Sequence, residues 1–470
     1  MFSSFFLKTR NFLIHNGTSS QNVKFVTELI AYKALSDTMA ANPAALIGFL
    51  KETLPSQSAP TFQQIVDSVQ NTKDDLSDVF NAYADAWNNV LRPEWAIFQE
   101  YKGSIHPQLL MPIIEALQEI TLRIDAPSEE TSAALFMDGW IQETSIITRE
   151  LETIVPSDVA KLMAKTISPQ RGEKVYDPCA GFSSLLTAVI AEEKALRLYG
   201  QEINTYAYEI ANINGMLHNC VDFCVRRDDS LMQPILEHDN TLMQFDKVLS
   251  IPPMGMRIPV EYLKYDEYNR FGWGLTARSR SEWLYLLTML AHCREKQGKL
   301  AILVPVGMLF STTASERSLR TKLVERNLID AVIALPPKIL HYTGIATALL
   351  IIDKRRETGG ELESRRDVLF INAANMNNSK RGRASLTDDS IERIVNCYAN
   401  RTTVDEFSYL ANLSEVAEKE FDLSPDVYTC PPPVAEHINT EALAQDIVEL
   451  EQTIQAKQQQ LDELLLLLRK

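Results

Sequence analysis

Between residues 174 and 354, short apolar runs rich in β-branched residues alternate with longer runs whose apolar residues recur at helical spacing. Strands that are apolar at every position are typical of a parallel sheet buried on both faces by helices. The alternation therefore predicts an α/β fold with a doubly wound, mostly parallel sheet. The expected strands are residues 174–176, 197–201, 223–226, 247–250, 300–304, 329–334, 348–352 and 368–373.

The first expected strand leads into the segment Val-Tyr-Asp-Pro-Cys-Ala-Gly-Phe-Ser-Ser at residues 175–184, which an apolar helical run follows. A strand, a glycine turn and a helix in this order are typical of the start of a nucleotide site in a doubly wound fold. Backbone amides and the helix N-terminus then face the ligand. An ordinary strand-to-helix turn is the alternative, because short glycine motifs also occur without function.

Three later segments follow the next three strands. They are Gly-Gln-Glu-Ile-Asn at 200–204, Asp-Asp-Ser-Leu at 228–231 and Ser-Ile-Pro-Pro-Met-Gly at 250–255. In this order and spacing they resemble the modification subunits of type I restriction–modification systems, which are S-adenosylmethionine-dependent adenine-N6 DNA methyltransferases. The resemblance extends over residues 150 to 375.

The resemblance implies that S-adenosyl-L-methionine is the cofactor and assigns four residues to it. Gly181 allows close approach of the backbone, and Asp177 hydrogen-bonds the methionine end. Glu202 takes the ribose hydroxyls, as the acid after the second strand does in dinucleotide folds. Asp229 reaches the adenine amino group. For Glu202 and Asp229 the alternative is a solvated charge at a strand end.

A wall of the cofactor site is expected from residues 152–156. Family members carry a run of the type Gly-Glu-Phe-Tyr-Thr-Pro here, against the methionine end. This chain keeps Glu152 and Pro156 but has Ile154 and Val155 in place of Tyr and Thr. Two hydroxyl groups are therefore missing from that wall.

The glycine turn also departs from the family, whose turn reads Gly-x-Gly-Gly. Ser183 and Ser184 replace the second and third of these glycines. Serine narrows the turn and requires a non-glycine residue to adopt a positive φ. We expect weaker cofactor binding as a result.

The loop after the fourth strand carries the catalytic positions, which the resemblance assigns to Ile251, Pro252, Pro253 and Met254. The family has Asn-Pro-Pro-Phe or Asn-Pro-Pro-Tyr, where the flipped adenine donates to the Asn side chain and a Pro carbonyl and stacks on the ring. Pro252 keeps its carbonyl, but Ile251 has no acceptor and Met254 is a poor stacking surface. Ser250 lies one position early, so its hydroxyl would reach the base only if the loop shifted. Losing an aimed acceptor costs orders of magnitude in rate.

Three residues are candidates for DNA contacts. Arg278 and Arg280 precede a helical run and could contact phosphates, although a serine-capped helix start explains them equally well. Tyr342, in a loop that resembles the family's loop near the target base, is a candidate stacking residue. The net charge of −16 argues against a chain that wraps DNA by itself. Either a partner supplies basic surface, or the acidic chain binds only small molecules or proteins.

Three regions are expected along the chain: a helical N-terminal domain at 1–125, the methyltransferase-like domain at 126–400, and a tail at 401–470. The tail contains an expected coiled-coil helix at 441–469, because apolar residues recur there in two heptad positions. The helix packs either on its own globular body or on a partner, such as a specificity-type subunit or a second copy of the chain. The positions are Leu443, Leu450, Lys457, Leu464 and Ile447, Ile454, Leu461, Leu468.

The remaining composition indicates a cytoplasmic protein without a metal site. Six scattered cysteines without a neighbouring histidine cluster are expected to be free thiols. No apolar run approaches membrane-spanning length. The apolar N-terminus is broken by Lys8 and Arg10 and has no cleavage site after it, so we do not expect a signal peptide.

Two functions remain open. One is a DNA adenine-N6 methyltransferase, the modification subunit of a type I-like restriction–modification or related DNA defence system, with weakened catalysis. The other is a catalytically inactive protein of methyltransferase fold that acts in assembly or in sensing foreign DNA. A methyl-transfer measurement separates them.

Overall fold

The computed structural model describes the chain in two compact units, Met1–Thr429 and Cys430–Lys470, which we treat separately. The described residues are 3–16, 20–51, 59–98, 101, 105–147, 154–237, 239–256, 258, 263, 266–274, 280–340, 342–376, 378, 384–430, 449–458 and 460–461. Glu152, Arg278 and most of the expected coiled coil lie outside them.

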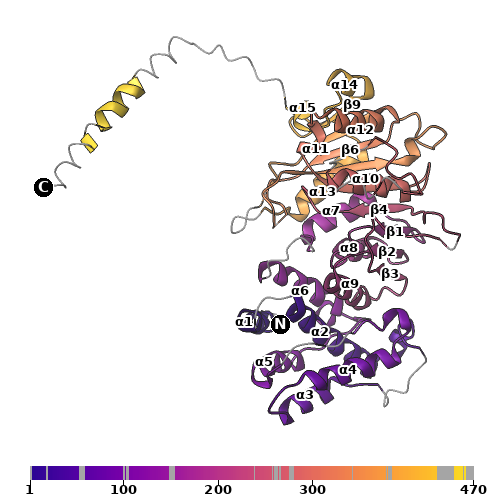
Figure 1. Cartoon of the computed structure of the whole chain (residues 1–470), viewed down its shortest axis with the longest axis vertical. Coiled ribbons are helices and arrows are strands. Elements are labelled where there is room, and N and C mark those ends of the chain that lie inside the picture. The colour runs from indigo at the N-terminus through magenta and orange to yellow at the C-terminus, as the bar shows by residue number, and fades with distance from the viewer. Residues whose placement is uncertain are drawn as a thin grey trace. The chain divides into compact units, whose positions relative to one another are not determined.

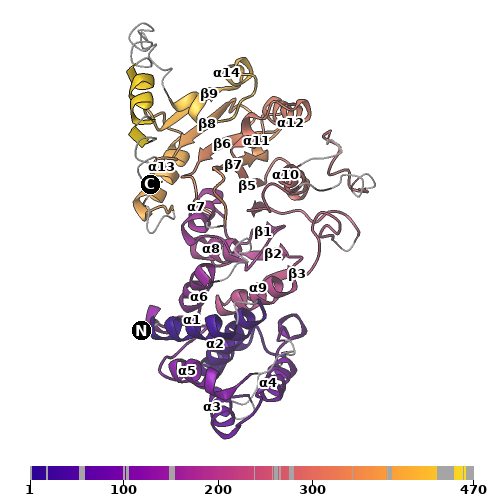
Figure 2. The ribbon, with the colours of Figure 1, turned by 60° about the vertical axis from the view of Figure 1, so that its left-hand side comes forward.

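The first unit contains a nine-stranded sheet in the order β3-β2-β1-β4-β5-β7-β6-β8-β9 (Figures 1 and 2). Most neighbouring strands are parallel, but β7 runs antiparallel to β5 and β6, and β9 to β8. The predicted doubly wound, mostly parallel sheet is confirmed. The strands are β1 Lys174–Asp177, β2 Arg197–Gln201, β3 Phe223–Arg226, β4 Lys247–Ser250, β5 Lys299–Pro305, β6 Ile329–Ala334, β7 Thr347–Asp353, β8 Asp367–Asn372 and β9 Ser408–Asn412.

Strand β9 was not expected from the sequence. It pairs with β8 from Ser408 opposite Ile371 to Asn412 opposite Asp367. The sheet therefore continues past residue 400, where the sequence had suggested the start of a tail. Two short helices, α14 (Leu413–Glu418) and α15 (Asp426–Thr429), follow it within the same unit.

Alternate residues of the strands face two separate hydrophobic clusters, which is the reason for their unbroken apolar sequence. In β5, Ala301 and Leu303 belong to one cluster, while Leu300 and Ile302 belong to the other. Helices α7, α8 and α13 contribute to the first cluster and α10 and α12 to the second (Figure 2). These helices are α7 Ser157–Ile167, α8 Ser184–Glu192, α10 Ser281–His292, α12 Ala314–Glu325 and α13 Asp388–Asn400.

The N-terminal part of the same unit is helical, as its apolar spacing predicted, and its described residues up to 147 form no strand. Helix α2 packs against α9 (Thr205–Leu217), and Lys24 of α2 lies 3.4 Å from Glu209 of α9 and 3.0 Å from Glu28. All three side chains are buried. The helices are α1 Ser3–Asn16, α2 Ser20–Ala41, α3 Phe62–Asn71, α4 Ser77–Val90, α5 Pro107–Gln118 and α6 Ala133–Ile147.

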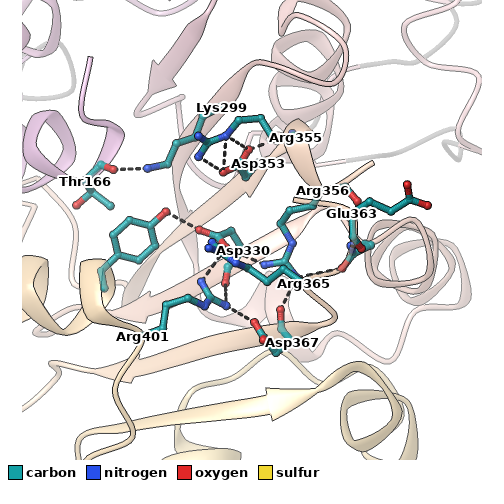
Figure 3. Close-up of polar contacts among 12 residues, drawn as sticks. Thr166, Lys299, Asp330, Asp353, Arg355, Arg356, Glu363, Arg365, Asp367 and Arg401 are labelled. Carbon is teal, nitrogen blue, oxygen red and sulfur yellow. Dashed lines mark hydrogen bonds and ion pairs between the residues drawn. The ribbon is translucent and has the colours of Figure 1, made fainter. Parts of the chain in front are cut away.

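Asp330 of β6 is the centre of a buried ionic cluster near the β8 side of the sheet (Figure 3). Its carboxylate lies 2.7 Å from Arg356 Nη1 and 2.8 Å from Arg401 Nη1, and it accepts a hydrogen bond from the Tyr398 hydroxyl. Burial alone would raise the pKa of Asp330, but Arg401 and Arg356 lower it to about 2. These contacts link β6 to the C-terminal end of α13.

In the second unit, residues 449–458 and 460–461 are helical. Leu450, Ile454 and Leu461, which the heptad pattern placed on one stripe, are between 56% and 62% exposed. Within the second unit taken by itself, no described residue covers the stripe. Among the described residues, no helix combines the length and the apolar character that spanning a membrane requires.

Candidate functional site

The residues expected to bind the cofactor follow neighbouring strands. Asp177 ends β1, Glu202 follows β2, Asp229 follows β3, and Ser250 ends β4. Because β1 to β4 are parallel, their carboxyl ends share one edge of the sheet, where doubly wound folds bind ligands. Hydrogen bonds between these segments join them into one site.

Asp177 is buried at the centre of this edge. Its Oδ1 accepts hydrogen bonds from the Cys179 amide at 2.9 Å and the Ser250 hydroxyl at 2.7 Å. Its Oδ2 is also buried but accepts no hydrogen bond from any described residue. Burial, and to a smaller extent the nearby Glu202, raise the pKa of Asp177 to about 7, although the hydrogen bonds from Cys179 and Ser250 lower it. The free oxygen is therefore an acceptor that a ligand could use.

Glu202 reaches across to the glycine turn. Its Oε2 accepts from the Gly181 amide at 2.8 Å, and its Oε1 accepts from the Asn204 amide at 2.7 Å. Burial raises its pKa. Gly181 has φ 53°, a left-handed conformation that glycine adopts without strain. Glu202 is thus a buried group and not the solvated strand-end charge that was its alternative.

The serine at the third position of the turn adopts the conformation that the sequence predicted. Ser183 has φ 63° and precedes the first residue of α8. The hydroxyl groups of Ser183 and Ser184 are buried and have no hydrogen-bond partner among the described residues. A strained backbone and two buried unpaired hydroxyls are the structural cost of replacing two glycines.

Asp229 forms a local turn beside the first strand's loop. Its carboxylate accepts from the Leu231 amide at 3.0 Å, and the next residue, Ser230, donates its hydroxyl to the Pro178 carbonyl at 2.8 Å. Arg270, nearly fully buried, donates to the carbonyls of Ser230 and Leu231. Sequence reasoning missed Arg270, because no local pattern marks a residue that acts 40 positions away.

The loop after β4 does not offer a side-chain acceptor at its second position. Ile251 is 8% exposed and Met254 is partly buried, and both belong to the hydrophobic cluster on one face of the sheet. Ser250 lies one position early and is fully buried, with its hydroxyl oriented by the hydrogen bond that it donates to Asp177. Its oxygen can still accept a hydrogen bond, but it would reach a base only if the loop shifted. Pro252 and Pro253 complete the loop between them.

Three further residues were expected at the site from the sequence: Pro156, Arg280 and Tyr342. Pro156 is buried at the start of α7. Arg280 pairs with Glu316 of α12 at 3.4 Å, and its side chain is 40% exposed. Tyr342 is partly buried and packs against the same cluster as Ile251 and Met254.

The site suits S-adenosylmethionine in part. A buried, unpaired carboxylate oxygen at Asp177 matches a cofactor end that carries an ammonium group, and Glu202 stands where an acid meets ribose hydroxyls. The Gly181 amide is occupied by Glu202. No cluster of three or more potential metal ligands occurs among the residues described, and all six cysteines are free thiols.

Sequence comparisons identify relatives that match more than half of the chain. The methylase subunit of the type I restriction enzyme MjaVIII from Methanocaldococcus jannaschii is 27% identical over 299 residues, which is 60% of this chain and 50% of the relative. The MpnII methylase subunit from Mycoplasma pneumoniae is 26% identical over 358 residues, 71% of this chain and 63% of the relative. The chain thus spans half to two thirds of the length of these relatives.

A structural comparison agrees at the level of the fold. The type I restriction–modification methyltransferase subunit from Streptococcus thermophilus superimposes with a TM-score of 0.74 at 22% identity, covering 90% of this chain and 98% of that one. Residues 150–437 match the sequence model of N-6 DNA Methylase, and this range is more than half of the chain. The family uses S-adenosylmethionine as methyl donor. The chain therefore belongs to the N-6 DNA Methylase family.

Proposed function

We propose that this chain is the S-adenosylmethionine-dependent DNA adenine-N6 methyltransferase subunit of a type I-like restriction–modification system, and that its methyl transfer is slow. The observation that carries the proposal is the convergence of Asp177, Gly181, Glu202 and Asp229 on one edge of the sheet, beside the loop after β4. The related methylase subunits support the same activity.

Each residue has a defined part in this proposal. S-adenosylmethionine supplies an electrophilic methyl group when bound. Asp177 accepts a hydrogen bond from its methionine end through the free Oδ2, Glu202 accepts from the ribose, and Asp229 accepts from the adenine. Glu152 and Pro156 belong to the wall at the methionine end. Glu202 must share its oxygens with the backbone or release the Gly181 amide for the cofactor to fit.

The target adenine is placed by the loop after β4 and by Tyr342. Pro252 offers a backbone carbonyl to the amino group, and Met254 covers the base. Ile251 offers no acceptor, and the Ser250 oxygen would reach the base only if the loop shifted, so one amino hydrogen has no aimed acceptor. This missing acceptor is the reason for a slow rate. It also favours the second candidate function, an inactive relative that keeps the fold for assembly or sensing.

DNA and a specificity-type subunit are the proposed partners. Arg278 and Arg280 are the proposed phosphate contacts, Arg280 after release from Glu316. The net charge of −16 requires additional basic surface, which a specificity-type subunit would supply. The C-terminal helix would bind that subunit or a second copy of this chain.

Calorimetric titration with S-adenosylmethionine tests the cofactor assignment. The full-length parent should bind, and Glu202→Ala should bind at least roughly tenfold more weakly, because hydrogen bonds to charged groups are the stronger kind. Glu392→Ala, which removes an exposed carboxylate on α13, is the matched control and should bind like the parent. Equal binding by Glu202→Ala would refute the ribose role.

Methyl transfer to mixed-sequence DNA, measured with the product of a neighbouring specificity-type gene present, separates the two functions. Slow incorporation that Glu202→Ala abolishes supports the methyltransferase. Cofactor binding without any incorporation supports the inactive relative.

A further inference from the structure

The loop after β4 is attached to the first turn of α10 by three hydrogen bonds. The Ser281 hydroxyl donates to the Pro253 carbonyl at 2.7 Å, and the Ser281 amide donates to the Met256 carbonyl at 2.9 Å. The Gly255 amide donates to Glu282 Oε1, also at 2.7 Å. Two consecutive residues of α10 thus bind three backbone groups of residues 253–256.

Burial makes these bonds stronger than surface contacts. Ser281 is 0% and Glu282 is 1% exposed. A carboxylate that accepts from a backbone amide makes a charge-assisted hydrogen bond, and its place in the first turn of a helix is favoured by the helix dipole. Removing Glu282 leaves the Gly255 amide without its acceptor.

Gly255 fits the same arrangement. Its φ of 72° lies in the left-handed region, and a Cβ added there would meet no atom within 4 Å. The glycine is therefore required for its backbone conformation and not for space. That conformation is the one in which its amide points to Glu282.

We propose that Ser281 and Glu282 are positioning residues that fix the backbone of the loop expected to hold the target adenine. Both residues bind main-chain groups of the loop, so these hydrogen bonds do not depend on the side chains at 251 and 254. It explains how the loop can keep a defined course although Ile251 and Met254 depart from the family. The identity of the bound base rests on the proposed function, whereas the hydrogen bonds do not.

If Glu282 were needed only for the fold, its substitution would disturb the sheet, whereas a residue that positions the loop should affect the loop alone. Trp283 and Leu284 are 2% and 0% exposed and pack α10 against the sheet. Substitutions at Glu282 should therefore leave the sheet intact and change the loop.

Hydrogen exchange of the full-length protein tests the attachment without any substrate. In Glu282→Ala, peptides covering residues 251–256 should exchange at least roughly tenfold faster, because a charge-assisted bond is lost. Glu282→Gln keeps an acceptor and should restore most of the protection, and peptides of β5 should be unchanged in both. Unchanged loop exchange in Glu282→Ala would overturn the proposal. Should that variant not fold, Ser281→Ala removes one hydroxyl and carries the same comparison.

A kinetic measurement tests the consequence. In an Ile251→Asn, Met254→Phe background, Glu282→Ala should lower kcat about tenfold or more without changing the Kd of S-adenosylmethionine, and Glu282→Gln should recover kcat. A lower cofactor affinity with unchanged kcat would contradict positioning. If neither the parent chain nor the Ile251→Asn, Met254→Phe variant transfers methyl groups, the proposed function fails. The hydrogen-exchange experiment still decides the role of Glu282 in that case.

Discussion

Asp177 uses only one of its two carboxylate oxygens in hydrogen bonds with the described residues. One oxygen is held by the Cys179 amide and the Ser250 hydroxyl, and the other is buried without a hydrogen bond from the described residues. With a pKa of about 7, the group is partly protonated at neutral pH. Its charge, and with it the attraction for a cationic ligand, therefore changes in the physiological range.

We expect cofactor affinity to rise with pH because of Asp177. Its pKa in the folded protein lies above the ordinary 3.8, so the ionised form accumulates only as pH passes about 7. The Kd of S-adenosylmethionine, measured by calorimetry between about pH 6 and pH 8, should fall by roughly tenfold. The Asp177→Asn variant keeps every other titrating group, including those of the ligand. The pH dependence of its Kd should therefore lack only the change that comes from Asp177. Parallel profiles for parent and variant would contradict the assignment.

Restoring the family side chains in the loop should raise the rate of methyl transfer. An unpaired amino hydrogen costs about 1–3 kcal/mol, and base–aromatic stacking is worth about 1–3 kcal/mol. Ile251→Asn with Met254→Phe should therefore increase incorporation of labelled methyl groups by at least roughly tenfold. Ile251→Val with Met254→Leu changes the same positions without adding an acceptor or a ring, and should have no such effect. Rapid transfer by the parent would show that another group replaces the missing Asn.

The sequence located the strand-end residues but not their partners. Asp177, Glu202 and Asp229 follow strands whose apolar runs are clear, so their common edge was predictable. The hydrogen bond from Ser250 to Asp177 spans 73 positions, and Arg270 reaches Ser230 across 40. Such contacts depend on how distant segments meet, which local pattern does not encode.

At the scale of elements, strand positions could be predicted from short runs of apolar, β-branched and aromatic residues. The strands β2, β3, β4 and β6 have the predicted bounds, and the fully buried β5 and β7 extend one residue beyond theirs at each end. The direction of β7 could not be read from its sequence, since antiparallel and parallel buried strands are equally apolar. Edge strand β9, Ser-Tyr-Leu-Ala-Asn, is short and only two of its five residues are fully buried, so its sequence lacks the long apolar run of the central strands.

The ionic cluster of β6 should contribute strongly to stability. Asp330→Ala leaves Arg356 buried and without its carboxylate partner, a change that costs about 3–5 kcal/mol in buried pairs. Arg365→Ala is the control, because Arg365 is 35% exposed and 3.8 Å from Asp330, and exposed pairs contribute at most about 1 kcal/mol. Urea unfolding of both variants measures the difference. Equal midpoints would show that the cluster adds no net stability.

The same cluster predicts sensitivity to acid. The pKa of Asp330 falls from 3.8 to about 2 on folding, so its contribution is present above about pH 4 and is lost as pH falls toward 2. The free energy of unfolding of the parent should decline across this window more steeply than that of Asp330→Asn. Identical slopes would contradict the assigned pKa.

At the scale of the whole molecule, the proposed assembly with partners rests on the acidic charge and on the exposed C-terminal stripe. A net charge of −16 opposes binding to DNA phosphates by this chain alone. Leu450, Ile454 and Leu461 are exposed on one helix, which by itself would be marginally stable in water. Both features are accounted for by a partner that supplies basic surface and a facing helix.

Removal of residues 440–470 should therefore leave a folded protein that no longer associates. The compact first unit ends at Thr429 and contains the entire sheet, so its fold does not require the C-terminal helix. Size-exclusion profiles of full-length and shortened protein, each with the specificity-type subunit present, should differ, while thermal unfolding of the first unit should not. Leu450→Lys with Ile454→Lys offers a matched test at full length, because charges on the stripe prevent helix packing without shortening the chain. Association that persists in both variants would mean that another surface forms the complex. Loss of association in the shortened chain alone would assign the contact to the rest of the tail and exclude the heptad stripe.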